Sequence, residues 1–216
     1  MEGSVAIEER YPTILQAALE IFARRGYHQA SIREIARAAD LSLAGLYHYV
    51  RGKDELLFLV IDRSLDGLLA KLDAALAEAV TPEAKLLALI RTHLEFAFHQ
   101  GEALKVINRD IEALAEPHRT AAATKRHSYL ARGLEVLSGL DKHGRSDDEL
   151  LDATNLLLGM LNGIATRPFM APSASYRSVA EVVENLFLYG FLGMGRDSTP
   201  TPRWSPEPSS EKAAHV

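Results

Sequence analysis

The sequence contains no cysteine, which excludes disulfide bonds, thiolate nucleophiles and cysteine-ligated metal sites. It also lacks any stretch near the ~20 uninterrupted apolar residues that a membrane-spanning helix needs. The first ten residues have no basic start followed by an apolar run, so they do not resemble a secretory signal. We therefore expect a cytoplasmic protein that makes no contact with a membrane.

Sequence patterns of catalysis are missing as well. There is no nucleophile paired with a base, no glycine loop for phosphates, no His-Glu-x-x-His motif and no cluster of carboxylates. The histidines at positions 93, 99, 118 and 127 are spaced too irregularly to indicate a metal site. We expect no cofactor and no metal, and an all-helical enzyme is the less favoured alternative.

Positive charge is scarce overall but concentrated near the N-terminus. The formal net charge is -5, yet residues 21–53 contain six arginines or lysines against two acidic residues. An acidic protein with a basic tip is repelled from DNA except through that tip, and this orients its encounter with DNA. The same charges could instead be scattered over solvated faces.

Apolar residues recur at helical spacing almost throughout, and no segment alternates as a half-buried strand does. The sequence predicts an all-α protein. Ser31 with Glu34, Ser146 with Glu149 and Ser178 with Glu181 have the spacing of capping boxes at helix starts. Together with proline and glycine positions, these predict helices over residues 12–25, 32–39, 43–49, 53–80, 82–100, 103–116, 117–140, 147–166 and 179–195.

The predicted helices divide the chain into three parts. Residues 1–53 form a three-helix unit, and residues 54–195 form a helical body. Residues 196–216 hold four prolines among Ser, Thr and Glu, which predicts a disordered tail containing Trp204. Two short helices joined by a three-residue corner, after a longer supporting helix, form a helix-turn-helix whose second helix enters the major groove of DNA.

Residues 14–56 closely resemble the TetR family of transcriptional regulators. The resemblance lies in Ala17-Ala18, Phe22, Gly26-Tyr27, Ser31 to Ala36, Leu41-Ser42, Leu46 to Tyr49 and Lys53 to Leu56. It implies a DNA-binding regulator with an N-terminal helix-turn-helix domain. Two residues depart from the family pattern: Asp40 stands at the corner where glycine is usual, and Val50 stands where phenylalanine is usual.

The helix-turn-helix supplies two kinds of predicted DNA contact. Tyr47 and Lys53 can donate to phosphates, and Ser31 and Ser42 can cap their helices and contact phosphate. Base edges would be read from the exposed side of the recognition helix, with an arginine of the preceding helix as the best candidate for a guanine. The predicted base-reading residues are Arg33, Leu43, Ala44, Gly45 and His48.

The last two helices are predicted to form a homodimer. Gly159 and Gly163 lie one turn apart and would let another helix approach, and the final helix, with Val183 and Phe187, is apolar over most of its circumference. The family resemblance implies that these two helices pair with their copies in a four-helix bundle. Internal packing alone is the alternative explanation of the apolar excess.

Polar residues that interrupt apolar helical faces are the candidates for binding a small-molecule effector. We predict a pocket from His93, Phe96, Asn108, Arg109, Asn155, Asn162 and Arg167. Segments around residues 108–119 and 159–162 resemble the branch of the family that responds to acyl-CoA thioesters. That branch implies an apolar cavity for the acyl chain and arginines, here Arg109 and Arg167, for the CoA phosphates.

These features predict a sequence-specific repressor that leaves a palindromic, double-stranded operator when a small hydrophobic effector binds, with an acyl-CoA thioester as the candidate. The mechanism is a population shift towards a dimer whose two DNA-binding domains no longer match the groove spacing of ~34 Å. A DNA-binding protein without an effector remains the open alternative. Operator sequence, effector identity and the direction of regulation are not encoded in recognisable motifs.

Overall fold

The computed structural model describes residues 2–165, 176–191 and 193. In these ranges every regular element is helical, which agrees with the predicted all-α class. The elements are α1 (Glu2–Arg25), α2 (Ile32–Ala38), α3 (Leu43–Tyr47), α4 (Lys53–Glu78), α5 (Pro82–His99), α6 (Gly101–Asp110), a 3-10 turn (Ile111–Ala113), α7 (His118–Leu140), α8 (Asp147–Ala165), α9 (Tyr176–Asn185) and a π-helical turn (Leu186–Phe191).

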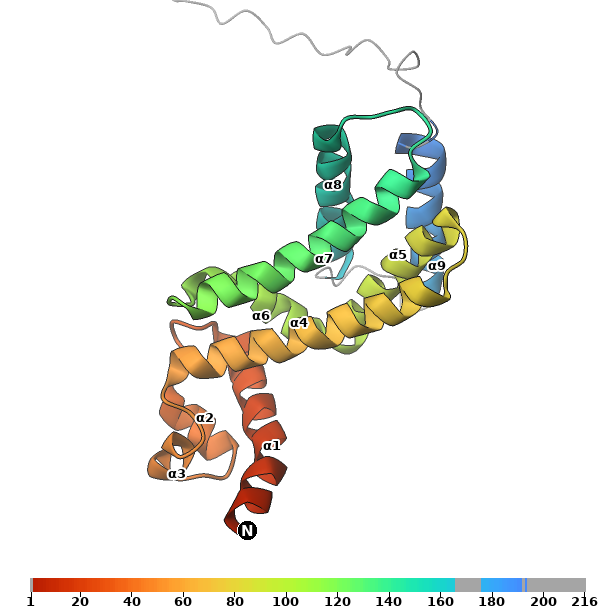
Figure 1. Cartoon of the computed structure of the whole chain (residues 1–216). Helices are drawn as coiled ribbons and strands as arrows, with labels where there is room; N and C mark the ends of the chain where they lie inside the picture. The colour runs from red at the N-terminus through yellow and green to blue at the C-terminus, as the bar shows by residue number, and fades with distance from the viewer. Residues whose placement is uncertain (1, 166–175, 192, 194–216) are drawn as a thin grey trace, which may run out of the picture.

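The helices form a small N-terminal domain and a longer body (Figure 1). Helices α1, α2 and α3 make the domain at one end, and α4 leaves it as a long rod that α7 accompanies along the body. Helix α1 also packs against α4 and α6, so the domain is attached to the body through two helices. At the far end α9 packs against α5, and α8 packs against α5 and α7. A single set of buried side chains runs through both parts.

Four predicted helix boundaries were wrong. Helix α1 begins at Glu2 and includes Pro12, because proline removes one backbone donor yet does not always end a helix. Gly101 opens α6 and does not close α5. Helix α6 ends at Asp110 in a 3-10 turn, although it was expected to reach residue 116. Helix α9 begins at Tyr176, two residues before Ser178.

The predicted helix caps formed at Ser42 and Ser146, whereas Ser31 makes no side-chain cap and Ser178 lies inside α9. Ser42 Oγ accepts from Gly45 N at 2.9 Å, and Thr81 caps α5 in the same way. At the start of α8 the capping box is reciprocal: Ser146 N donates to Glu149 Oε2 at 2.8 Å, and Glu149 N donates to Ser146 Oγ at 3.3 Å. Ser31 makes no side-chain cap, and the Glu34 carboxylate accepts from Arg25 Nε at 2.9 Å and does not reach back to the start of α2.

Helices α7 and α8 approach most closely at a glycine. A Cβ added to Gly133 would lie 2.8 Å from Thr154 Cγ2, which is closer than real side chains approach. Thr154 is fully buried, and its hydroxyl donates to Leu150 O at 2.7 Å within α8. The tight contact positions α8 against α7, and the cavity described below lies along these two helices.

Candidate functional site

The helix-turn-helix has the predicted corner. Asp40 adopts φ 55°, the left-handed conformation for which glycine is usual and which Asp tolerates better than most residues. Leu41 N donates to Ala36 O at 2.9 Å and closes the end of α2. Leu46 and Val50 are buried, so the smaller residue at position 50 still packs into the core of the domain.

The predicted DNA contacts lie on α2, on α3 or directly beside them, except for Lys53, which begins α4. Ser31, Arg33, Ser42, Ala44, Tyr47 and His48 are exposed, whereas Leu43 and Gly45 are half-buried. Within the described part of the chain, no hydrogen bond or ion pair engages the guanidinium of Arg33. Tyr47 exposes 48% of its surface, which is high for a tyrosine of a small helical domain. Its ring is therefore available at the surface.

Lys53 has a structural role that the sequence did not indicate. Its Nζ donates to Tyr27 O at 2.9 Å and to Ala30 O at 3.1 Å, and it lies 4.4 Å from the centre of the Tyr27 ring. These contacts join the start of α4 to the turn between α1 and α2. A third, longer bond goes from Nζ to His28 O at 3.5 Å. An ammonium group has three protons to donate, so a phosphate contact by Lys53 would have to share or replace one of these three bonds.

A cavity of about 480 Å³ lies within the helical body. Four predicted effector residues, His93, Asn108, Asn155 and Asn162, line it. Leucines and one isoleucine make up much of the remaining wall, with Arg126 and His127 of α7 also contributing. The lining residues come from α4, α5, α6, α7 and α8, and they are Leu65, Leu68, His93, Leu104, Ile107, Asn108, Arg126, His127, Tyr129, Leu130, Asn155, Leu158, Gly159 and Asn162.

The deepest polar group of the cavity is a buried histidine. His93 exposes 3% of its surface, and its Nδ1 lies 3.1 Å from the hydroxyl of buried Tyr129. Its Nε2 has no hydrogen-bond partner among the described residues. Burial lowers the pKa of His93 to about 4, so the ring is neutral at pH 7. A smaller opposing effect comes from hydrogen bonding with the side chain of Asn162, whose Oδ1 already accepts from Asn108 and forms no normal hydrogen bond with Nε2. Burial also raises the pKa of Tyr129, which keeps its hydroxyl protonated.

The remaining polar part of the cavity wall is formed mainly by the neutral amides of three asparagines. Asn108 Nδ2 donates to Asn162 Oδ1 at 2.9 Å, which joins α6 to α8 across the cavity. Asn155 is exposed on α8 and also faces the cavity. Among the lining residues only Arg126 carries a fixed charge, and its side chain is 55% exposed. The cavity therefore has a neutral polar interior.

Three predicted effector residues are not part of this cavity as described. Phe96 is buried in the core and does not line the cavity. Arg109 binds the end of α1, as described below, and Arg167 lies outside the described residues, as does the predicted tail. The sequence analysis missed Tyr129, Arg126 and His127. A tyrosine on the buried face of α7 was the available signal, but the α7 segment has a weak apolar pattern.

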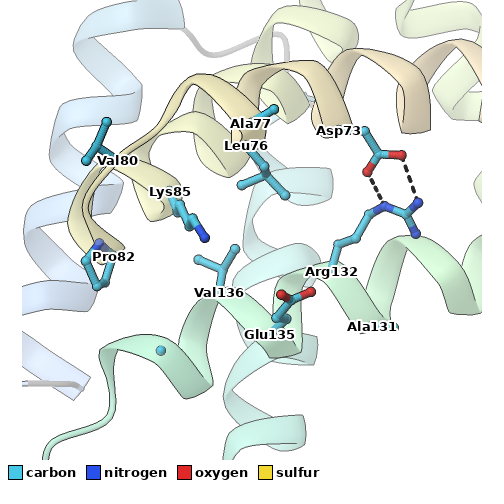
Figure 2. A pocket seen from close by; sticks show the side chains of 11 residues that line it. Asp73, Leu76, Ala77, Val80, Pro82, Lys85, Ala131, Arg132, Glu135 and Val136 are labelled. Atoms are coloured by element: carbon cyan, nitrogen blue, oxygen red, sulfur yellow. Dashed lines mark hydrogen bonds and ion pairs between the residues drawn. The ribbon is translucent and has the colours of Figure 1, made fainter.

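A larger cleft of about 710 Å³ lies between α7 and the junction of α4 with α5 (Figure 2). Arg132 forms a bidentate ion pair with Asp73 there, and Lys85 and Glu135 also line the cleft. The guanidinium of Arg132 and the carboxylate of Asp73 thus neutralise each other and hydrogen-bond with each other. None of the predicted effector residues lines this cleft, and it has no buried polar group comparable to His93. The predicted effector residues thus gather at the smaller cavity and not at this cleft.

Two sets of polar contacts lie where the body meets the N-terminal domain. Arg109 of α6 donates to the carbonyl oxygens of Phe22 and Ala23 at the end of α1, and its guanidinium pairs with Asp110 at 2.7 Å. Asp110 is buried and also accepts from Tyr27 N at 3.4 Å. Helix α6 thus lines the cavity of about 480 Å³ through Leu104, Ile107 and Asn108. The last two residues of α6, Arg109 and Asp110, bind the end of α1 and the turn that follows it.

The second set lies at the start of α4. Asp54 Oδ2 is 2.6 Å from His118 Nδ1, and Asp54 Oδ1 accepts from Ala115 N at 2.9 Å. The His118 ring stacks on Phe58 with centroids 4.3 Å apart. These interactions fix the first turn of α4, which immediately follows the helix-turn-helix, to the first turn of α7.

The outer surface of α8, of α9 and of the π-helical turn that follows α9 carries exposed apolar side chains. Val182 and Leu186 each expose 59% of their surface, Tyr189 exposes 79%, and Leu156 of α8 exposes 68%. Val183 and Phe187, which we predicted at a dimer interface, are instead buried in the core of the single chain, because this side of α9 packs on α5. A Cβ at Gly159 or Gly163 would meet no atom within 4 Å.

None of the described helices is long and apolar enough to cross a membrane. No group of three or more histidine, cysteine or acidic side chains in the described ranges could hold a metal ion.

A helix-turn-helix joined to a helical body with an internal cavity defines a DNA-binding regulator, and comparison with known proteins gives the family. Residues 14–60 match "Bacterial regulatory proteins, tetR family", and residues 79–166 match "Tetracyclin repressor-like, C-terminal domain". A TetR-family transcriptional regulator from Bordetella parapertussis is 30% identical, with a TM-score of 0.77 over 85% of this chain and 96% of that one. The chain belongs to the TetR family of transcriptional regulators, whose members are DNA-binding proteins and not enzymes.

Other relatives are similar over part of their length or in fold alone. The transcriptional activator FasR of Mycolicibacterium smegmatis is 33% identical over 100 residues, which are 46% of each chain, so the match spans about half of that relative. The structure of AibR in complex with isovaleryl coenzyme A and operator DNA has a TM-score of 0.72 and 22% identity. It covers 82% of this chain and 97% of AibR.

Proposed function

We propose that this regulator is a homodimeric repressor that binds a palindromic operator and releases it when a hydrophobic effector, an acyl-CoA thioester, enters the cavity. The observation that carries the proposal is helix α6. Leu104, Ile107 and Asn108 of this helix line the cavity. Its last two residues, Arg109 and Asp110, bind the end of α1 and the turn after it.

The DNA contacts follow from exposure and chemistry. Arg33 reads a guanine edge, and Leu43, Ala44, Gly45 and His48 contact neighbouring bases in the major groove. Ser31, Ser42, Tyr47 and Lys53 bind phosphates, which fixes the register without reading sequence. The unpaired guanidinium of Arg33 and the exposed ring of Tyr47 support this division.

The effector acts through α6. Packing is dense in protein interiors, so a ligand that pushes Leu104 or Ile107 moves α6 as a unit. Asp110 is buried and held by Arg109 and Tyr27, so that movement is passed to the end of α1 and changes the angle of the DNA-binding domain. The contact of Asp54 with His118 keeps the start of α4 fixed to α7 and serves as the pivot.

The proposal that the effector is an acyl-CoA rests on the size of the cavity and on the residues that line it. An apolar wall with a few neutral polar groups suits an acyl chain with its carbonyl. A cavity of about 480 Å³ is too small for a whole acyl-CoA, so the nucleotide end would lie outside it, on the side of Arg126. The effector in the AibR structure, isovaleryl coenzyme A, belongs to the same chemical class.

The proposal predicts ligand-induced stabilisation that depends on this cavity. An acyl-CoA present at ~100 times its dissociation constant should stabilise the protein by about 2.7 kcal/mol, which raises the melting temperature of a chain of this size by roughly 5–10 °C. The measurement is thermal unfolding with isovaleryl-CoA, octanoyl-CoA and palmitoyl-CoA, with free CoA as the reference.

Two matched variants separate the two cavities. Leu158→Trp fills the assigned cavity and should abolish the shift, whereas Leu76→Trp fills the charged cleft and should leave it intact. Both positions are half-buried, so the substitutions are comparable. A protein that no thioester stabilises would be a DNA-binding regulator without this effector. A shift lost only in Leu76→Trp would place the ligand in the charged cleft.

A further inference from the structure

The polar interior of the cavity specifies the chemistry of the group that it binds. This inference rests on the proposed function, since it concerns the same cavity. His93 is 3% exposed, lines the cavity, and has one ring nitrogen without a hydrogen-bond partner among the described residues. A buried polar group without a partner is rare in native proteins and calls for an explanation such as an absent ligand.

The Tyr129 hydroxyl determines which kind of partner His93 needs. A phenol is the better donor of this pair and a neutral imidazole nitrogen is the better acceptor, so Tyr129 donates to Nδ1 across 3.1 Å. A neutral imidazole carries one proton, and it must then be on Nε2. The free nitrogen of His93 is therefore a donor, and it requires an acceptor atom on the ligand.

The surroundings exclude an anionic partner at this depth. Asn108, Asn155 and Asn162 are neutral, and Arg126, the one lining residue of fixed charge, is half-exposed. A carboxylate buried beside His93 would have no opposite charge to offset its lost hydration. The carbonyl oxygen of a thioester, ester, amide or ketone can accept from His93 Nε2 without the free-energy cost of burying a charge.

We propose that the cavity selects ligands with a neutral hydrogen-bond acceptor set in an apolar chain, that His93 Nε2 donates to that acceptor, and that Tyr129 positions the ring. His93 is then a specificity-determining residue. A free fatty acid of the same chain length is rejected.

The test compares three probes that share one alkyl chain. Octanoyl-CoA has the carbonyl, S-octyl-CoA lacks it and is otherwise nearly identical, and octanoate is the free acid. Isothermal titration of the full chain should give binding about tenfold tighter for octanoyl-CoA than for S-octyl-CoA, since one hydrogen bond to a buried group is lost. Octanoate should bind more weakly than either.

Variants assign the difference to His93. His93→Leu should bind the thioester and the thioether equally, and Tyr129→Phe should reduce the tenfold preference, because the ring loses the contact that fixes its tautomer. His127→Gln alters another histidine of the cavity wall and should retain the full preference. Nitrogen-15 NMR of the His93 ring gives a readout in the ligand-free protein, where the proton is expected on Nε2.

The outcomes are distinct. Equal binding of octanoyl-CoA and S-octyl-CoA by the unaltered protein would overturn the role of His93 and leave the effector function standing. Tightest binding of octanoate, or a ring proton on Nδ1, would also overturn it. Failure of all three probes would refute the acyl-thioester function itself, and this inference with it.

Discussion

Leu186→Arg is expected to convert the dimer into a monomer and to weaken operator binding by roughly 100-fold or more. Leu186 is 59% exposed beside Val182 and Tyr189, and a cation placed in a dry interface between two copies would lose its hydration without a partner. Two linked DNA-binding domains gain 10²- to 10⁴-fold in affinity over separate ones, and the monomer loses that gain. Sedimentation velocity and operator titration measure the two effects.

Val80→Arg is the matched control. Val80 is 92% exposed at the turn between α4 and α5, so the same substitution there should change neither the mass of the assembly nor the operator affinity. The interface on α8 and α9 would be refuted if Leu186→Arg remained dimeric, or if both variants dissociated alike. Gly163→Leu probes the neighbouring surface of α8 and is expected to weaken the dimer as well.

Arg33→Ala is expected to reduce operator affinity by ~1–3 kcal/mol per half-site while affinity for nonspecific DNA changes much less. The reason is that a bidentate contact to guanine is lost, and no contact within the described protein held the guanidinium beforehand. The preference for one symmetric pair of base positions should relax. Competition binding against a set of operators substituted at single positions would reveal which pair.

Tyr47→Phe is the control for a phosphate contact. It removes one hydroxyl at an exposed ring and should weaken operator and nonspecific DNA by similar, smaller factors. Lys53→Ala is a less clean comparison, because its ammonium also holds the turn between α1 and α2. If Arg33→Ala weakened all DNA equally and Tyr47→Phe altered the base preference, the assignment of the two residues would be reversed.

The helix-turn-helix could be predicted well because its determinants are local. A capping serine at position 42, a residue tolerant of positive φ at position 40, and the buried Leu46 beside the half-buried Leu41 determine its corner. The failed capping box shows the limit of local patterns. Glu34 has the right spacing from Ser31, yet Arg25, nine residues away and at the end of the preceding helix, offers it an ion pair.

The body could be predicted only in part because its contacts are long-range. The sequence identified His93 as a polar residue in an apolar face, but its partner Tyr129 lies 36 residues away on a helix with little apolar pattern. An arginine suited to phosphate, Arg109, proved to bind α1 because the fold brings residues 87 positions apart together. When a helix is apolar around most of its circumference, the sequence also does not show which side packs into the core of the same chain and which side is exposed. Val183 and Phe187 are on the buried side.

The central claim is that the cavity and the operator are linked through the protein. The measurement that tests it most directly is an anisotropy titration of an operator, selected from random duplexes by the protein itself, with and without the acyl-CoA that stabilises the protein most. The account predicts that the ligand weakens operator binding by about tenfold or more, and that the operator weakens ligand binding by the same factor. An operator affinity that stays unchanged while the ligand occupies the cavity would contradict the account.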